Sequence, residues 1–227
     1  MTRLRDARLS RRRLCRRLAA GTPLLLAAGC ASLLPQPGQP PQLYLLRSRV
    51  KFPPDLPRVS QQLLVALPVA SAGLDTERIA LSRSAVTLDY FANAAWTDHA
   101  PALVQSLLVR SFEATGKIVG VARDSASLRP DYLLLSELER FEAVYSDSEA
   151  APKVEAALVL RLARMPDRVI IGERRAERSA AAGANSMAPI VAAFGEALDG
   201  ALEELVAWTL RRISADAASG ARRGAAP

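Results

Sequence analysis

The sequence predicts an α+β domain in which two amphipathic helices pack on a single, mostly antiparallel sheet. Two apolar stripes have helical spacing, and segments typical of strands lie before and after the first of them. Three of these segments are long and follow one another closely, as in an antiparallel meander. Of the 227 residues, 50% are hydrophobic, which is enough for a packed core, and the length is typical of one domain.

The strands are predicted from short apolar runs and from alternation of apolar and polar residues. Before the first helix they cover residues 42–48, 61–70, 78–83 and 85–91, the last two as a hairpin. After the first helix they cover residues 117–123, 131–145, 153–165 and 168–179. The turn-like breaks SDSEAAP and PD separate the last three strands, so we expect these to pair in sequence with their apolar residues on one face.

The first helix is predicted between the motif WTDHAP and Gly116, a typical stop signal. Its apolar face carries Leu103, Val104, Leu107, Leu108 and Phe112. The second helix is predicted after Asn185-Ser186 and continues towards Ile213. Its stripe consists of Ile190, Val191, Phe194, Leu198, Leu202, Leu205 and Val206. We interpret both stripes as core against the sheet rather than as partner surfaces.

Within WTDHAP, the only histidine of the chain, His99, directly follows Asp98, which raises the hypothesis of a catalytic pair. Adjacent side chains project away from each other, however, and the spacing fits a helix start better. Thr97 or Asp98 can cap free backbone amides, and an acidic residue suits the positive end of the helix dipole. Pro101 is tolerated in a first turn because its missing N–H is unpaired there anyway.

The positive charge of the chain is confined to its N-terminal segment. Residues 1–29 hold eight arginines and one acidic residue, Asp6, whereas basic and acidic residues balance at 22 each in the remainder. The formal net charge of +7 therefore belongs to this segment alone. A neutral body with scattered arginines is a poor electrostatic footprint for nucleic acid, so we expect no nucleic-acid partner.

The same segment is typical of an export signal. A cationic start is followed by a short apolar run, Leu18 to Ala28, and by small residues before Cys30. This run is too short to span a bilayer, which needs about 20 apolar residues. The run Ser10-Arg11-Arg12-Arg13-Leu14 is similar to a twin-arginine signal, so the Sec and twin-arginine routes both stay open.

The exit Leu26-Ala27-Ala28-Gly29-Cys30 resembles the lipobox of bacterial lipoproteins, with Ala27 in place of the usual leucine. This resemblance implies lipidation of Cys30 and cleavage before it; the alternative is an ordinary signal with a chance cysteine. Ala31, rather than aspartate, implies an outer-membrane destination. Cys15 would leave with the signal, and the lipid would occupy Cys30, so no thiol would be left for a disulfide or a metal.

Four regions follow from these patterns. We expect a cleaved signal at residues 1–29, a lipidated cysteine with a flexible tether rich in Pro, Gln and Gly at residues 30–41, the folded domain at residues 42–213, and a small, polar, disordered tail at residues 214–227.

Enzyme motifs are missing or incomplete. Ser48 and Lys51 match S-x-x-K, but the S-D-N and K-T-G elements of that chemistry are absent. There is no G-x-S-x-G, no phosphate-binding glycine loop and no histidine cluster for a metal. Carboxylate and arginine pairs, Glu137/Glu139, Glu203/Glu204, Arg174/Arg175 and Arg222/Arg223, are explained by solvated faces. We therefore expect no catalytic residues, no cofactor and no metal.

The order and spacing of several features resemble the ABC-type transport auxiliary lipoprotein family, the PqiC-like lipoproteins that accompany Mce-domain lipid transporters. The resemblance covers about residues 30–213. Its features are Tyr44-x-Leu46, Pro68, Gly73-Leu74-Asp75-Thr76 before Arg78-Ile79, Tyr90 before Trp96, Pro101-x-Leu103-Val104-Gln105, the helix end from Phe112 to Gly116, and Phe141-x-Ala143-x-Tyr145.

This resemblance implies an accessory subunit that faces the periplasm, is anchored to the outer membrane, and docks a periplasmic Mce-domain protein. An inner-membrane ABC permease and ATPase would be indirect partners, and the subunit could form a homo-oligomer. Candidate contact regions are the proline-rich loop around Phe52 and exposed strand edges. Two alternatives stay open: a carrier that holds lipid in its own fold, motivated by apolar residues in the long strands 133–145 and 154–162, and a hydrolase that uses Asp98 and His99.

Overall fold

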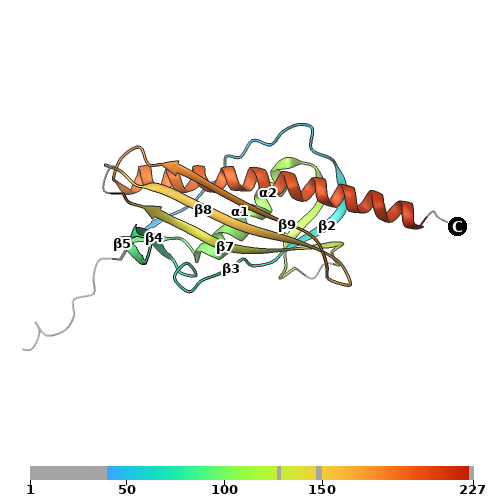
Figure 1. The fold of residues 1–227 in the computed structure, drawn as a ribbon, viewed down its shortest axis with the longest axis horizontal. Helices are drawn as coiled ribbons and strands as arrows, with labels where there is room; N and C mark the ends of the chain where they lie inside the picture. Colours follow the sequence, from blue (N-terminus) through green and yellow to red (C-terminus); the bar gives the residue numbers. More distant parts are fainter. Residues whose placement is uncertain (1–39, 127–128, 147–149, 225–227) are drawn as a thin grey trace, which may run out of the picture. The chain divides into compact units, whose positions relative to one another are not determined.

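A computed structural model of the protein describes residues 40–126, 129–146 and 150–224. The predicted signal, Cys30 and nearly all of the tether lie outside the described residues. The described residues form two helices and one nine-stranded sheet, so the predicted α+β class is confirmed (Figure 1). The strands are β1 (Gln42–Tyr44), β2 (Val59–Val65), β3 (Val69–Ala70), β4 (Arg78–Ser84), β5 (Thr87–Trp96), β6 (Ile118–Arg123), β7 (Tyr132–Val144), β8 (Lys153–Arg164) and β9 (Val169–Ala181).

The C-terminal meander and the hairpin are confirmed. Strand β8 pairs antiparallel with β7 and β9 along nearly its whole length, and β4 pairs antiparallel with β5. The predicted strand 61–70 is divided into β2 and β3 at Pro68, which has no N–H to donate to a ladder. The predicted strand 42–48 already ends at Tyr44.

Strand β7 connects the two parts of the sheet. On one side it pairs with β8, and on the other it forms short parallel ladders with β2, β3 and β4. Further parallel ladders join β1 to β5 and β2 to β6. All of these parallel ladders are shorter than the two ladders of β8, and they bring together strands that are distant in the sequence.

Helix α1 (Ala100–Thr115) begins and ends where the sequence predicts, but its start is built differently. Pro101 lies in the first turn, and Gly116 ends the helix in the left-handed conformation at φ 60°. His99 is the N-cap residue and its side chain makes no capping bond, so the prediction that Thr97 or Asp98 caps the helix is wrong. The Asp98 carboxylate instead accepts a hydrogen bond from the His99 backbone N–H, 2.8 Å away.

Helix α2 (Met187–Gly224) begins where the sequence predicts and runs past Ile213 to Gly224. The prediction of a disordered tail from Ser214 is therefore wrong for residues 214–224. Alanine-rich sequence has a high helix propensity, and Asp216 fixes this part of the helix to the sheet through Tyr132 and Arg164. Figure 1 shows α2 lying across β7, β8 and β9.

The core lies between α2 and the inner face of the meander. The apolar residues of β7 and β8 alternate along this face, and the α2 stripe covers them. Trp96, Phe141 and Phe194 meet here, with ring centroids 5.1 Å apart for Trp96 and Phe194 and 4.8 Å apart for Phe141 and Phe194, both edge to face. Most of the apolar residues that motivated the lipid carrier therefore belong to the core, although Leu135 is 37% exposed.

Candidate functional site

The histidine of WTDHAP pairs with Asp75, a carboxylate that is distant from it in the sequence. Nδ1 of His99 lies 2.8 Å from Oδ1 of Asp75, in the loop between β3 and β4, and both side chains are exposed. The hydrogen bond with Asp75 raises the pKa of His99 above its usual value. The pair therefore differs from the Asp98–His99 pair that the sequence suggested.

The S-x-x-K match lacks a catalytic geometry. Ser48 lies in an irregular segment rather than at a helix start, and its Oγ accepts a 3.4 Å hydrogen bond from the backbone N–H of Val50. Lys51 is exposed to solvent. The described residues contain no group of three or more His, Cys, Asp or Glu side chains that could hold a metal ion. In the same part of the chain, neither helix has a stretch that is both long enough and apolar enough to cross a membrane.

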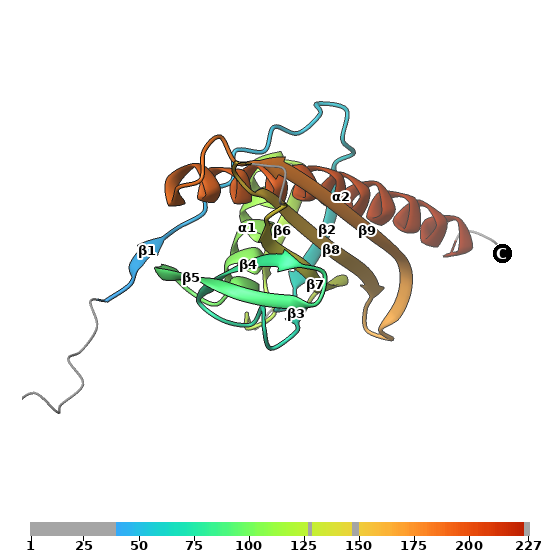
Figure 2. The ribbon, with the colours of Figure 1, turned by 60° about the vertical axis from the view of Figure 1, so that its left-hand side comes forward.

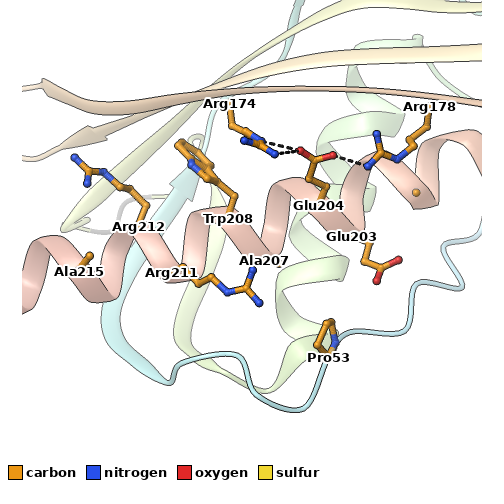
Figure 3. A pocket seen from close by; sticks show the side chains of 11 residues that line it. Pro53, Arg174, Arg178, Glu203, Glu204, Ala207, Trp208, Arg211, Arg212 and Ala215 are labelled. Carbon is orange, nitrogen blue, oxygen red and sulfur yellow. Dashed lines mark hydrogen bonds and ion pairs between the residues drawn. The ribbon is translucent and has the colours of Figure 1, made fainter.

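An open groove of about 690 Å³ runs beside α2, between β9 and the proline-rich loop, and we name it the arginine groove (Figure 3). Its lining residues are Pro53 of the loop, Arg174 and Arg178 of β9, and Gly200, Glu203, Glu204, Ala207, Trp208, Arg211, Arg212 and Ala215 of α2. Four arginines against two glutamates give the lining a positive charge.

Glu204 holds two of these arginines on the side of the groove that faces β9. Its Oε1 accepts a 2.7 Å hydrogen bond from Nε of Arg174, and its Oε2 accepts a 2.6 Å hydrogen bond from Nη2 of Arg178 (Figure 3). Arg174 and Arg178 are four residues apart on one strand, so their side chains share a face and reach the same helix. Glu204 therefore ties α2 to β9 through both oxygens.

Two glycines allow the close approach of α2 and β9. A Cβ on Gly172 would lie 3.1 Å from the Trp208 ring and 3.2 Å from the Arg212 side chain. A Cβ on Gly200 would lie 3.2 Å from the Arg178 side chain. Arg212 in turn donates a 2.6 Å hydrogen bond from Nε to the backbone carbonyl of Ile171. The lining of the groove thus has close contacts between α2 and β9 and a net positive charge that can attract anions.

Charged side chains of β7, β8 and β9 that lie outside the arginine groove also form ion pairs. Arg161 bonds to Glu173 at 2.6 Å, and Arg175 bonds to Glu139 at 2.6 Å. Glu137 also accepts from Arg161, at 3.4 Å. At Glu137, Glu139 and Arg175 the predicted solvated faces therefore carry paired charges. The sequence could not show this, because Glu139, Arg161 and Arg175 lie on different strands.

The match that decides the family covers most of the folded domain. The model of the ABC-type transport auxiliary lipoprotein component matches residues 44–206. The chain belongs to this family. The family is one of lipoproteins that assist ABC-type transport, which agrees with a membrane anchor and with a role other than catalysis.

Solved structures of other proteins show a similar fold. The crystal structure of protein XCC0632 from Xanthomonas campestris is 32% identical, covers 78% of this chain and 98% of that chain, and superposes with a TM-score of 0.73. A second crystal structure, of an uncharacterized protein, covers 77% of this chain and 99% of that chain at 17% identity and a TM-score of 0.55, and it shows the fold alone.

A curated relative is longer than this chain. The uncharacterized protein bll6063 of Bradyrhizobium diazoefficiens is 31% identical over 170 residues, which are 75% of this chain and 45% of that protein. The chain therefore spans less than half of the length of that relative.

Proposed function

We propose that this auxiliary lipoprotein is anchored to the outer membrane, faces the periplasm, and docks the Mce-domain subunit of an ABC-type lipid transport system. The observation that carries the proposal is the family match over residues 44–206. The resemblance to the PqiC-like lipoproteins, which includes WTDHAP and the strand 132–144, supports the Mce-domain partner.

The N-terminal sequence supports the anchor. A lipobox-like exit before Cys30 implies acyl chains on this cysteine, and each buried methylene contributes about 0.8 kcal/mol of membrane affinity. Several chains on one residue make the attachment effectively permanent. The following residues, 31–41, are rich in proline and glutamine, which suits an extended tether between the membrane and the domain.

The surface of the domain supports docking at a strand edge rather than at the proline-rich loop. Phe52 packs partly against the core, so it is poorly placed as a contact. Strand β6, by contrast, is hydrogen-bonded only to β2 among the described strands, and Val119 on it is 77% exposed. An unpaired edge with an exposed apolar side chain can add a strand from a partner.

The proposal is tested by crosslinking the tagged full chain in its native envelope and identifying the captured proteins by mass spectrometry. We expect an Mce-domain protein among the captured partners. Val119→Asp should reduce this capture at least several-fold, whereas Val86→Asp, at an exposed hairpin position away from β6, should leave it unchanged. Recovery of only unrelated envelope proteins would overturn the docking proposal.

The anchor is tested separately by Cys30→Ser. The variant should move from the outer-membrane fraction to the soluble periplasmic fraction, while the crosslinked partner stays the same when the two proteins are mixed after purification. A variant that is still found in the membrane fraction would show that Cys30 is not the site of attachment.

A further inference from the structure

A second groove, distinct from the arginine groove, lies along α1. The segment of residues 45–52, which leads from β1 towards β2, passes over α1 and α2, and its Leu46 is buried in the core (Figure 2). The backbone N–H of Arg49 donates a 2.8 Å hydrogen bond to Asp199 of α2, which fixes the segment on that side. Between the segment and α1 a groove of about 600 Å³ is left open.

This groove combines apolar walls with positive charge alone. Its lining residues are Leu45, Leu46, Arg47, Ser48, Val50 and Phe52 of the segment, Thr97, and Leu103, Ser106, Leu107, Arg110 and Ala114 of α1. Arg47 and Arg110 are the only charged residues among these, so no carboxylate of the lining neutralises them. We name this the amphipathic groove.

The two arginines are free to bind a ligand. Arg47 and Arg110 are exposed, and neither side chain forms a hydrogen bond or an ion pair with another described residue. This differs from the arginine groove, where Glu204 holds Arg174 and Arg178. A guanidinium group has a planar set of donors that matches the oxygens of a phosphate, and the apolar wall beside it suits a hydrocarbon chain.

We propose that the amphipathic groove binds one anionic phospholipid, with an acyl chain along Leu103 and Val50 and the phosphate between Arg47 and Arg110. The volume lies within the range of small-molecule sites, which is about 300–1,000 Å³. Leu45 follows Cys30 by fifteen residues, a stretch that spans at most about 50 Å when fully extended, so an anchored chain keeps the groove near the lipid surface.

This inference rests on the proposed function and extends it, because it gives the docking subunit a lipid site of its own. The charge of the groove favours a lipid with net negative charge over a zwitterionic one, since the amine of the latter would face two unneutralised guanidinium groups. The ligand is held at the surface and is not enclosed, as would suit a lipid passed on to a partner.

The test uses the full lipidated chain in nanodiscs of phosphatidylcholine that contain a trace of phosphatidic acid with a photoreactive acyl chain. Crosslinked peptides are mapped by mass spectrometry, and we expect the label in residues 45–52 and 103–114. The double variant Arg47→Glu and Arg110→Glu should lower the labelling about tenfold or more. The matched control is Arg58→Glu with Arg129→Glu, two exposed arginines outside the groove, which should label like the unmodified chain.

A second variant tests the apolar half without a change in charge. Ala114→Trp places a bulky ring in the groove from an exposed position of α1, and it should lower the labelling to a similar degree while the thermal unfolding midpoint stays the same. Labelling that is spread over the surface, that survives both variants, or that is equally strong with photoreactive phosphatidylcholine would overturn the proposal. An excess of inorganic phosphate should not compete, and competition at millimolar phosphate would show that the site takes the free anion.

The same variants separate this inference from the docking proposal. If the groove variants lose the lipid label and still capture the Mce-domain protein, both proposals hold and act at different surfaces. If no lipid is bound while the partner is captured, the lipid site fails and the docking role stands.

Discussion

The hydroxyl of Tyr132, at the start of β7, donates a 2.9 Å hydrogen bond to the carboxylate of Asp216 in α2. Arg164, at the end of β8, donates to the same carboxylate at 2.8 Å. Asp216 is largely buried, with 10% of its side chain exposed, so one acidic residue joins the last part of the helix to the open end of the β7–β8 hairpin. This end of α2 is therefore part of the folded domain.

Asp216→Ala should lower the free energy of unfolding by about 1–3 kcal/mol, because it leaves the Tyr132 hydroxyl and the Arg164 guanidinium without their acceptor. Urea denaturation followed by circular dichroism measures the change. The matched control is Glu203→Ala, on the same helix, which has no ion pair with a described residue and should change stability by less than about 0.5 kcal/mol. Equal stability of the two variants would contradict the role of Asp216.

The ionisation of Tyr132 reports on the same contact. Burial of the phenol, and then its hydrogen bond to Asp216, raise its pKa to about 12. Because the folded-state pKa lies above the unfolded value of about 10, the folded state binds the proton more tightly, and this contribution to stability is lost as the pH rises from about 10 to 12. In Asp216→Asn the pKa should fall but stay above 10, as ultraviolet titration of the tyrosinate would show.

His99 should titrate above its ordinary range and in dependence on Asp75. Its folded-state pKa is raised, so any stability that the pair contributes is fully present below about pH 6.5 and is lost as the pH rises through the folded-state pKa. NMR titration of the ring should show the raised pKa, and Asp75→Asn should lower it. In Asp98→Asn the decrease should be smaller, because the direct hydrogen bond is with Asp75.

The aromatic cluster at the start of α2 should be the most sensitive part of the core. Phe194 is fully buried and contacts both Trp96 and Phe141 edge to face. Phe194→Ala should cost about 3–5 kcal/mol of unfolding free energy, and Phe194→Leu clearly less, because leucine refills most of the cavity. A change below about 1 kcal/mol in Phe194→Ala would show that the three rings are not packed as described.

Glu204 should contribute modestly and in a salt-dependent way. Its partners Arg174 and Arg178 are half exposed, so Glu204→Gln should cost about 1 kcal/mol or less at low ionic strength, and less in high salt. The variant frees both guanidinium groups, so the arginine groove should bind inorganic phosphate more tightly than in the unmodified chain. Isothermal titration calorimetry distinguishes this outcome from unchanged binding, which would indicate that Glu204 does not neutralise the pair.

Local patterns predicted the elements well, and contacts between distant residues were the part that they missed. Apolar periodicity located α1, the start of α2 and the C-terminal meander, because each is defined by neighbours within a few residues. The parallel ladders of β7 with β2, β3 and β4 have no such local signature. The polar composition after Ser214 suggested disorder, because nothing in the sequence shows that Asp216 meets Tyr132.

The same limit applies to the sites. Asp98 is next to His99 in the sequence, but the carboxylate that contacts the His99 ring is that of Asp75, which lies in another loop. The two arginines of the amphipathic groove lie 63 positions apart in the chain, and only the packing of residues 45–52 on α1 brings them to one groove. The lipidation of Cys30 stays a prediction from a local motif, because Cys30 lies outside the described residues.

The position of β7 in the sheet affects the order in which the chain can fold. Strands β2, β3 and β4 all pair with a strand that follows them by more than forty residues, whereas β7, β8, β9 and α2 contact their neighbours in sequence order. Long-range parallel pairing is slow because the loop-closure entropy is lost before the contacts form. We therefore expect the C-terminal meander and α2 to fold first and the N-terminal strands to join last, so that the segment nearest the proposed anchor at Cys30 is the last to become structured.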